Sequence, residues 1–170
     1  MIILGIDPGY GIVGYGVIES LPGGRLRPIE CGAINTPKEY ALPKRLNFIG
    51  ERIDELMEKF HPDAVSIEEL FFQHNQTTAI AVAEARGIIL VSAYRKCKNL
   101  FEYTPMQIKQ AITGYGKADK KQIQYMVKLL LNLKEVPKPD DAADALAAAI
   151  THAQVANSSA AFGITGDKKW

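Results

Sequence analysis

The first 35 residues contain three strand-like runs with very short connections between them. The apolar run Ile2–Asp7 is followed by Pro8-Gly9, and the glycine-rich run 11–19 comes directly after it. The turn Pro22-Gly23-Gly24 then leads into a third run over 26–34. Connections this short join antiparallel strands, because parallel strands need a crossover of a dozen residues or more. The chain is therefore predicted to open with antiparallel strands, which argues against a Rossmann domain.

The rest of the chain alternates less regularly between helical and strand-like patterns. Apolar residues recur at helical spacing over 42–60, and the run 64–68 is typical of a short fourth strand. The remaining predicted elements are a helix over 76–96, a strand over 100–103 and helices over 105–113, 119–131 and 141–154. This order predicts an α/β fold with a five-stranded mixed sheet flanked by helices. We expect a single domain over residues 1–155 and a flexible tail over 156–170.

Composition narrows the class of protein. The 170 residues are 47% hydrophobic and 23% charged, as in soluble globular domains. The longest apolar stretch is interrupted by Glu84 and Arg86, so no membrane span is predicted. Cys31 and Cys97 are expected to be reduced thiols of a cytoplasmic protein. The net charge of +1 does not favour nucleic acid, but basic residues cluster over 95–98 and 117–121.

Four acidic residues occupy positions where α/β folds carry reactive groups. Asp7 and Glu68 end strand-like runs, and Asp141 and Asp144 lie one helical turn apart at a helix start. If they converge, their mutual repulsion requires protonation or bound cations. Oxygen-only ligands select Mg²⁺ or Mn²⁺, and a pair of such ions supports phosphodiester hydrolysis. Asp140 is interpreted as the N-cap of the last helix, whereas Asp144 is flanked by Ala and Leu, as on a packed surface.

The helix predicted over 76–96 is apolar on more than one side. Its apolar residues include Ile80, Val82, Ile88, Leu90 and Val91. One stripe suffices to cover a sheet, so a helix that is apolar nearly all round is either deeply buried or has a second partner.

The segments around the acids, Gly5-Ile6-Asp7-Pro8-Gly9, Ser66-Ile67-Glu68-Glu69-Leu70-Phe71 and Asp140-Asp141-Ala142-Ala143-Asp144, resemble the bacterial RuvC Holliday-junction resolvases in order and spacing. The resemblance runs from Ile2 to about Ala153. It implies an RNase H-like fold, a homodimer with the helix over 76–96 at its interface, and Mg²⁺-dependent paired nicking of four-way DNA junctions in recombination and repair. The ends left would be 5′-phosphate and 3′-hydroxyl. The resemblance also implies a branch-migration helicase of the RuvA and RuvB type as a partner.

Roles for individual residues follow from the same resemblance. Asp7, Glu68, Asp141 and Asp144 would be the catalytic metal ligands, with two Mg²⁺ per site and Mn²⁺ as a substitute. Glu69 is the alternative to Glu68, but neighbouring strand residues point to opposite faces and only one can join the cluster. The resemblance places Lys109 and Lys120 near the scissile phosphate, although Lys121 could take the role of Lys120. Phe71 would stack on bases at the crossover. Tyr115, in a Gly-flanked loop, is a further candidate for DNA contact.

Other functions fit the sequence less well. An actin-like or sugar-kinase ATPase also opens with a strand and Asp-x-Gly, but it needs a second phosphate-binding hairpin and a longer chain. A non-catalytic junction-binding protein is disfavoured because all four acids are present. An enzyme that cuts RNA–DNA hybrids is disfavoured by the second apolar face of the helix over 76–96 and by the aromatic loop at Phe71.

Overall fold

The computed structural model of the protein describes residues 1–70 and 76–162. The elements within these ranges are β1 (Ile2–Asp7), β2 (Ile12–Ser20), the 3₁₀ helix η1 (Pro22–Gly24), β3 (Leu26–Asn35), α1 (Leu42–Phe60), β4 (Ala64–Glu68), α2 (Gln76–Lys96), β5 (Leu100–Tyr103), α3 (Pro105–Thr113), α4 (Lys120–Leu130) and α5 (Asp140–Phe162).

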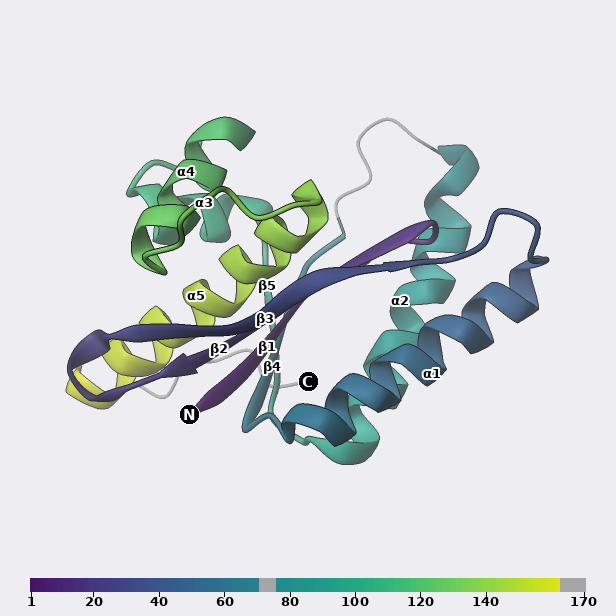
Figure 1. The fold of residues 1–170 in the computed structure, drawn as a ribbon, viewed down its shortest axis with the longest axis horizontal. Helices are drawn as coiled ribbons and strands as arrows, with labels where there is room; N and C mark the ends of the chain where they lie inside the picture. The colour runs from purple at the N-terminus through teal and green to yellow at the C-terminus, as the bar shows by residue number, and fades with distance from the viewer. Residues whose placement is uncertain (71–75, 163–170) are drawn as a thin grey trace.

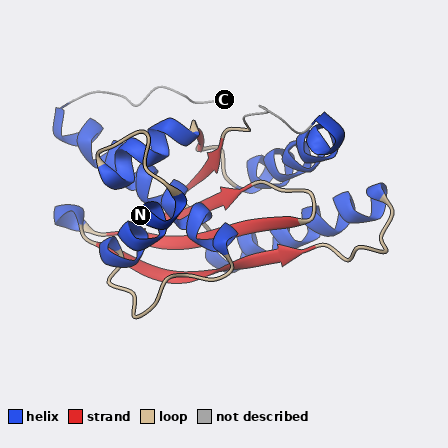
Figure 2. Cartoon of the chain, turned by 90° about the horizontal axis from the view of Figure 1, so that it is seen from above, coloured by secondary structure: helices blue, strands red, loops and turns tan. Residues whose placement is uncertain are grey.

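The five strands form one mixed sheet in the order β3-β2-β1-β4-β5. β2 pairs antiparallel with both β1 and β3, whereas β4 pairs parallel with β1 and with β5. Figure 2 shows these strands turning progressively from one to the next, as sheet twist requires. The prediction of a five-stranded mixed sheet with three antiparallel opening strands in an RNase H-like fold is confirmed.

Helices cover both faces of the sheet. α1 and α2 lie on one side and α3, α4 and α5 on the other (Figure 1). The alternation along β1 explains this arrangement, because Leu4 and Ile6 join the core under α1 and α2, while Ile3 joins the core under α5. Gly5 also faces α5, since a Cβ built there meets the backbone of that helix. Asp7, the last residue of β1, continues this face by the same alternation.

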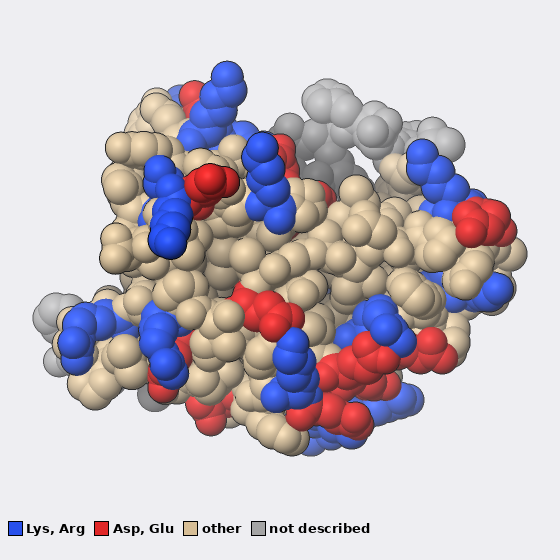
Figure 3. Space-filling view, viewed as in Figure 1, with Lys and Arg blue, Asp and Glu red and all other residues tan. Residues whose placement is uncertain are grey.

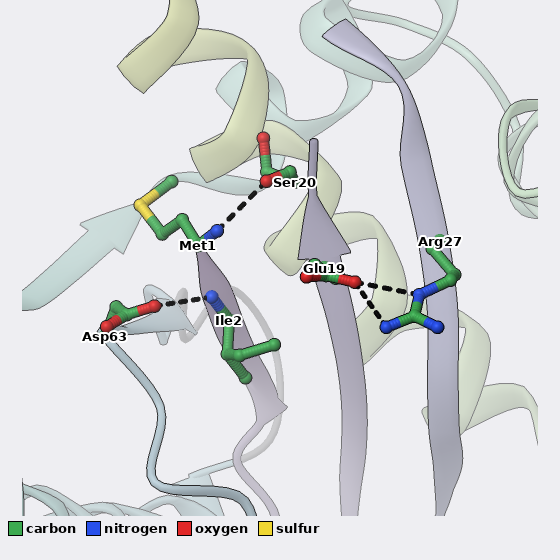
Figure 4. Close-up of polar contacts among 6 residues, drawn as sticks. All are labelled: Met1, Ile2, Glu19, Ser20, Arg27 and Asp63. Carbon is green, nitrogen blue, oxygen red and sulfur yellow. Dashed lines mark hydrogen bonds and ion pairs between the residues drawn. The ribbon is translucent and has the colours of Figure 1, made fainter. Parts of the chain in front are cut away.

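Polar contacts fix the end of the sheet at which β1 begins (Figure 4). The amino group of Met1 donates to the carbonyl of Ser20 at 3.0 Å, and the backbone N–H of Ile2 donates to Oδ2 of Asp63 at 2.7 Å. Nε of Arg27 donates to Oε2 of Glu19 at 2.8 Å, which joins β2 to β3. These contacts fix the start of β1, so its register delivers Asp7 to the other end of the sheet.

Local signals predicted most helix ends correctly. Thr104 is the N-cap of α3 in a capping box with Gln107, and Gly114 ends that helix in the left-handed conformation. The last helix differs from the prediction at both ends. Asp140 is its first residue rather than its N-cap, and the helix continues to Phe162 rather than ending near Gln154. Part of the predicted flexible tail is therefore helical.

In the described part of the chain, no helix is long and apolar enough to cross a membrane.

Candidate active site

Asp7 and Glu68 end two neighbouring parallel strands. The register pairs Ile6 with Ile67, so the next residue of each strand is an acid. Ser66 faces α5, because its hydroxyl donates to the carbonyl of Ala148 at 2.7 Å, and Glu68 therefore points to the same face. The two carboxylates thus lie side by side at the end of the sheet, on the α5 face.

Glycines on this face let α5 lie directly on the sheet. Asp7 pairs with Gly14 across β1 and β2, and a Cβ added to Gly14 would lie 2.0 Å from the carbonyl oxygen of Asp141. A Cβ on Gly5 would lie 2.0 Å from the carbonyl oxygen of Ala145. A glycine in a strand often marks such a close approach of another backbone. The first turn of α5 is therefore held against the strand pair that carries Asp7.

The facing surface of α5 is equally small. Its fully buried alanines are Ala142, Ala143, Ala145, Ala147, Ala148, Ala149 and Ala153. Where the methyl group of Ala149 faces Gly5, the backbones of α5 and β1 lie in close contact. The hydroxyl of Ser66 adds a fixed tie between β4, which carries Glu68, and α5, which carries Asp144.

The electrostatics show that the acids are close together. Burial, followed by the charges of Glu68, Asp144 and Asp141, raises the pKa of Asp7 from 3.8 to about 8. Burial and the charge of Asp144 raise the pKa of Glu68 from 4.5 to about 7. Burial also raises the pKa of Asp144, against the influence of Lys120. The charges of Glu68, Asp141 and Asp144 therefore all reach Asp7, and burial with the neighbouring carboxylates disfavours the charged forms of Asp7, Glu68 and Asp144.

Two of the predicted lysines lie beside this cluster. Nζ of Lys120 lies 3.0 Å from Oδ2 of Asp144 and 3.4 Å from Oδ2 of Asp140. Asp119 caps α4 and fixes Lys120 as the first residue of that helix. The charge of Lys109, on α3, acts to lower the pKa of Glu68. Lys121, the alternative to Lys120, is exposed, as is Lys120 itself.

The remaining predicted site residues are Tyr115 and Phe71, with Glu69 as the alternative to Glu68. Tyr115 is 58% exposed in the loop between α3 and α4, and Phe71 lies outside the described residues. Glu69 lies beyond the end of β4, where its backbone N–H donates to the carbonyl of Tyr103 at 2.9 Å. Within residues 1–70 and 76–162, no three His, Cys, Asp or Glu side chains are already arranged around a metal position. The carboxylates supply the donor atoms for one, and Lys120 forms ion pairs with Asp140 and Asp144.

Two features of the site were missed from the sequence. Asp140 was interpreted only as a helix cap, although its carboxylate holds Lys120. Nothing local signals that contact, since it spans 20 positions along the chain. Gly14 was quoted as part of a motif without a structural role. The signal that could have revealed it is a glycine inside a strand that pairs with the strand of an active-site acid.

Comparisons with known proteins identify relatives of this chain. Residues 3–152 match the family described as "Crossover junction endodeoxyribonuclease RuvC". Proteins of that name from Brevibacillus brevis and Alkaliphilus metalliredigens are 56% and 54% identical, over 91% and 90% of this chain and 92% and 93% of their own. The structure is similar to that of Thermus thermophilus RuvC in complex with a Holliday junction substrate, with a TM-score of 0.88 and 37% identity. That match covers 94% of this chain and 96% of the Thermus chain.

Distant structures share the fold. The yeast mitochondrial Holliday junction resolvase Ydc2 has a TM-score of 0.66 at 17% identity, over 89% of this chain and 77% of its own. The family match spans β1 to most of α5 and includes all four acids and both lysines beside them. The chain belongs to the RuvC family of crossover junction endodeoxyribonucleases.

Proposed function

We propose that the protein is a nuclease that resolves four-way DNA junctions by paired, symmetric hydrolysis. The proposal depends on one observation in a chain of the RuvC family. The strand register sets Asp7 beside Glu68 and pairs it with Gly14, and the backbone of Asp141 packs against that glycine. Acids gathered by the backbone alone, at the end of a sheet, favour chemistry on a phosphodiester. The products would carry 5′-phosphate and 3′-hydroxyl ends.

The site fits divalent cations. Asp7, Glu68, Asp141 and Asp144 supply oxygen donors only, which suits Mg²⁺, with Mn²⁺ as a substitute. The pKa values of Asp7 and Glu68 are raised first by burial and then by the neighbouring carboxylates, and bound divalent cations would lower both pKa values. When bound, two such ions would polarise the scissile phosphate, lower the pKa of an attacking water and stabilise the leaving oxygen.

The lysines complete the charge balance. Lys120 already lies against Asp144, and Lys109 is near enough to Glu68 to affect its ionisation. We expect both ammonium groups to attract the scissile phosphate and to offset the charge that develops on its oxygens during hydrolysis. Asp140 would orient Lys120 toward that position. Phe71, Lys121 and Tyr115 remain predicted DNA contacts.

Cleavage of a labelled four-way junction, beside linear duplex of the same sequence, tests the proposed function. With Mg²⁺ or Mn²⁺ we expect paired nicks at symmetric positions in the junction only, and none in EDTA. Junction binding without cleavage in either metal would favour a scaffold protein instead. Equal cleavage of duplex and junction would contradict junction resolution.

We further propose that the protein acts as a homodimer through α2. One face of this helix packs on α1 and the sheet through the buried residues Ala85, Ile89 and Ala93. Exposed residues on α2 form a second stripe at helical spacing: Ile80, Ala83, Gly87, Val91 and Tyr94. The small residues at its centre would let two copies approach closely, and a two-fold dimer would present two active sites to a junction of similar symmetry. A branch-migration helicase remains a predicted partner.

The variant Val91→Glu is expected to shift the protein from dimer to monomer, because it puts a charge into the apolar stripe. The measurement is sedimentation at micromolar concentration. Leu129→Glu on α4 is the matched control, since Val91 and Leu129 are 51% and 52% exposed and both are apolar. The control should sediment as a dimer. Equal behaviour of the two variants would contradict an interface on α2.

A further inference from the structure

A group of cations and aromatic rings lies on the α1 side of the sheet, beyond the β1–β2 turn. We define the hairpin–α1 patch by Tyr10, Lys38, Tyr40, Lys44 and Arg45. Nζ of Lys44 lies 3.8 Å from the ring centroid of Tyr40, and the guanidinium carbon of Arg45 lies 4.6 Å from that of Tyr10. Cation–π contacts of this kind order the aromatic rings under the charges.

Hydrogen bonds make the patch rigid. Arg45 donates from Nε to the carbonyl of Tyr40 at 3.1 Å and from its terminal nitrogen to the carbonyl of Lys38 at 2.7 Å. The hydroxyl of Thr36 donates to the carbonyls of Tyr10 and Gly11 at 3.0 and 3.1 Å. The turn that receives these bonds begins immediately after Asp7. The patch is therefore a fixed continuation of the strand that carries an active-site acid.

The cations of the patch differ from the others on α1. Further along the helix, Arg52 pairs with Glu55 and Lys59 pairs with Glu30. In the part of the chain that the structure describes, neither Lys38, Lys44 nor Arg45 forms an ion pair with a carboxylate. Lys38 and Lys44 are also exposed. Cations without a carboxylate partner are free to neutralise an external anion.

The distribution of charged side chains on the surface also differs between the start and the middle of α1. Asp and Glu side chains gather over the middle of α1, whereas Lys and Arg predominate at the end of the molecule where that helix begins (Figure 3). The exposed Glu39 is the acid of this segment. Lys109 and Lys120 belong to α3 and α4, which cover the opposite face of the sheet. Positive charge thus lies on both sides of the acid cluster.

We propose that the hairpin–α1 patch binds the phosphate backbone of a DNA arm that leaves the active site. This inference rests on the proposed function. Lys38 and Lys44 contact phosphates, and Arg45 holds the loop that presents them. Tyr10 and Tyr40 give the cations a stiff platform. Phosphate contacts carry no sequence information, so the patch supplies affinity and orientation rather than sequence preference.

Equilibrium binding of a fluorescent four-way junction tests the patch, in Ca²⁺ as a cation that is not expected to support cleavage. The double variant Lys38→Ala/Lys44→Ala should bind about tenfold more weakly near 0.15 M salt. The slope of log affinity against log salt should fall by about 1.8, because each lost phosphate contact removes about 0.9. Arg52→Ala/Lys59→Ala, on the same helix but at paired cations, should bind like the wild type. Glu39→Gln should bind more tightly.

Two outcomes separate the patch from the proposed function. Suppose that wild-type protein binds and cuts junctions, but Lys38→Ala/Lys44→Ala leaves both affinity and salt slope unchanged. The proposed phosphate binding by the hairpin–α1 patch is then wrong, while the proposed nuclease function is retained. If the wild type shows no preference for junctions over duplex, the proposed function fails and the patch fails with it. Thermal melting of each variant beside the wild type shows that its fold is retained.

Discussion

Asp7→Asn is expected to abolish junction cleavage while leaving junction binding intact. The neutral amide is a much weaker cation ligand than the carboxylate, and Asp7 is the acid on which Glu68, Asp141 and Asp144 all act. Loss of several kcal/mol of transition-state stabilisation corresponds to a fall of about 1,000-fold or more in the cleavage rate. The measurement is a single-turnover rate on a labelled junction in Mg²⁺, with affinity measured in parallel.

Glu69→Gln is the control, because it removes a neighbouring carboxylate that lies beyond the end of β4. This variant should cleave like the wild type, whereas Glu68→Gln should behave like Asp7→Asn. Cleavage by Asp7→Asn within tenfold of the wild-type rate would remove Asp7 from the catalytic set. Loss of cleavage in Glu69→Gln would contradict the choice of Glu68 over Glu69 as the metal ligand at the end of β4.

Asp7→Asn is also expected to change the thermal stability of the protein, which can be measured without cleavage. Without divalent cations, the folded protein holds a proton on Asp7 up to a pH of about 8, whereas the unfolded chain releases it near 3.8. Folded protein therefore binds more protons than unfolded protein between these values, and stability falls as pH rises through the window. Asp7→Asn removes this loss, so its gain in melting temperature should be larger at pH 8 than at pH 4. A variant that is less stable than the wild type at pH 8 would contradict this sign.

Local chemistry explains why so much of the fold could be predicted. The bounds of α1, β4, α2 and β5 follow from apolar spacing and flanking turn residues, and Thr104 and Gly114 mark the two ends of α3 with short-range hydrogen bonds. Asp140 shows where this reasoning fails. A carboxylate at a helix start is ordinarily a cap, and only the position of α4 in space makes it a partner of Lys120.

In the candidate site, too, local patterns could be predicted from the sequence, whereas contacts between distant segments could not. That Asp7 and Glu68 end strands, and that Asp141 and Asp144 share a helix face, could be predicted from periodicity. How closely the two pairs approach could not, because it depends on the contact between α5 and the sheet. Gly5 and Gly14 set that contact, and it involves segments more than 100 residues apart. Periodicity places residues on a face but does not give the distance between two faces.

Gly14→Ala tests whether this contact builds the site. The added Cβ would lie 2.0 Å from the carbonyl oxygen of Asp141, a backbone atom that moves only if the helix moves. Overpacking of this kind typically costs about 1–3 kcal/mol of stability. A displacement of catalytic groups by about 1 Å can lower the rate about 100-fold, so we expect cleavage to fall by at least that factor. Mn²⁺ affinity, measured by calorimetry without DNA, should fall as well.

Gly11→Ala is the matched control, since a Cβ at this position of the same hairpin meets nothing within 4 Å. It should retain cleavage, Mn²⁺ affinity and melting temperature. Junction affinity should be retained in both variants, because the lysines that contact phosphates lie on other segments. If Gly14→Ala keeps the wild-type cleavage rate, the first turn of α5 can move without disturbing its acids, and the close approach of helix and strand is then a feature of packing alone. If Gly14→Ala loses cleavage and Mn²⁺ affinity together while junction affinity stays, the absent side chain at Gly14 is what brings Asp141 and Asp144 to Asp7.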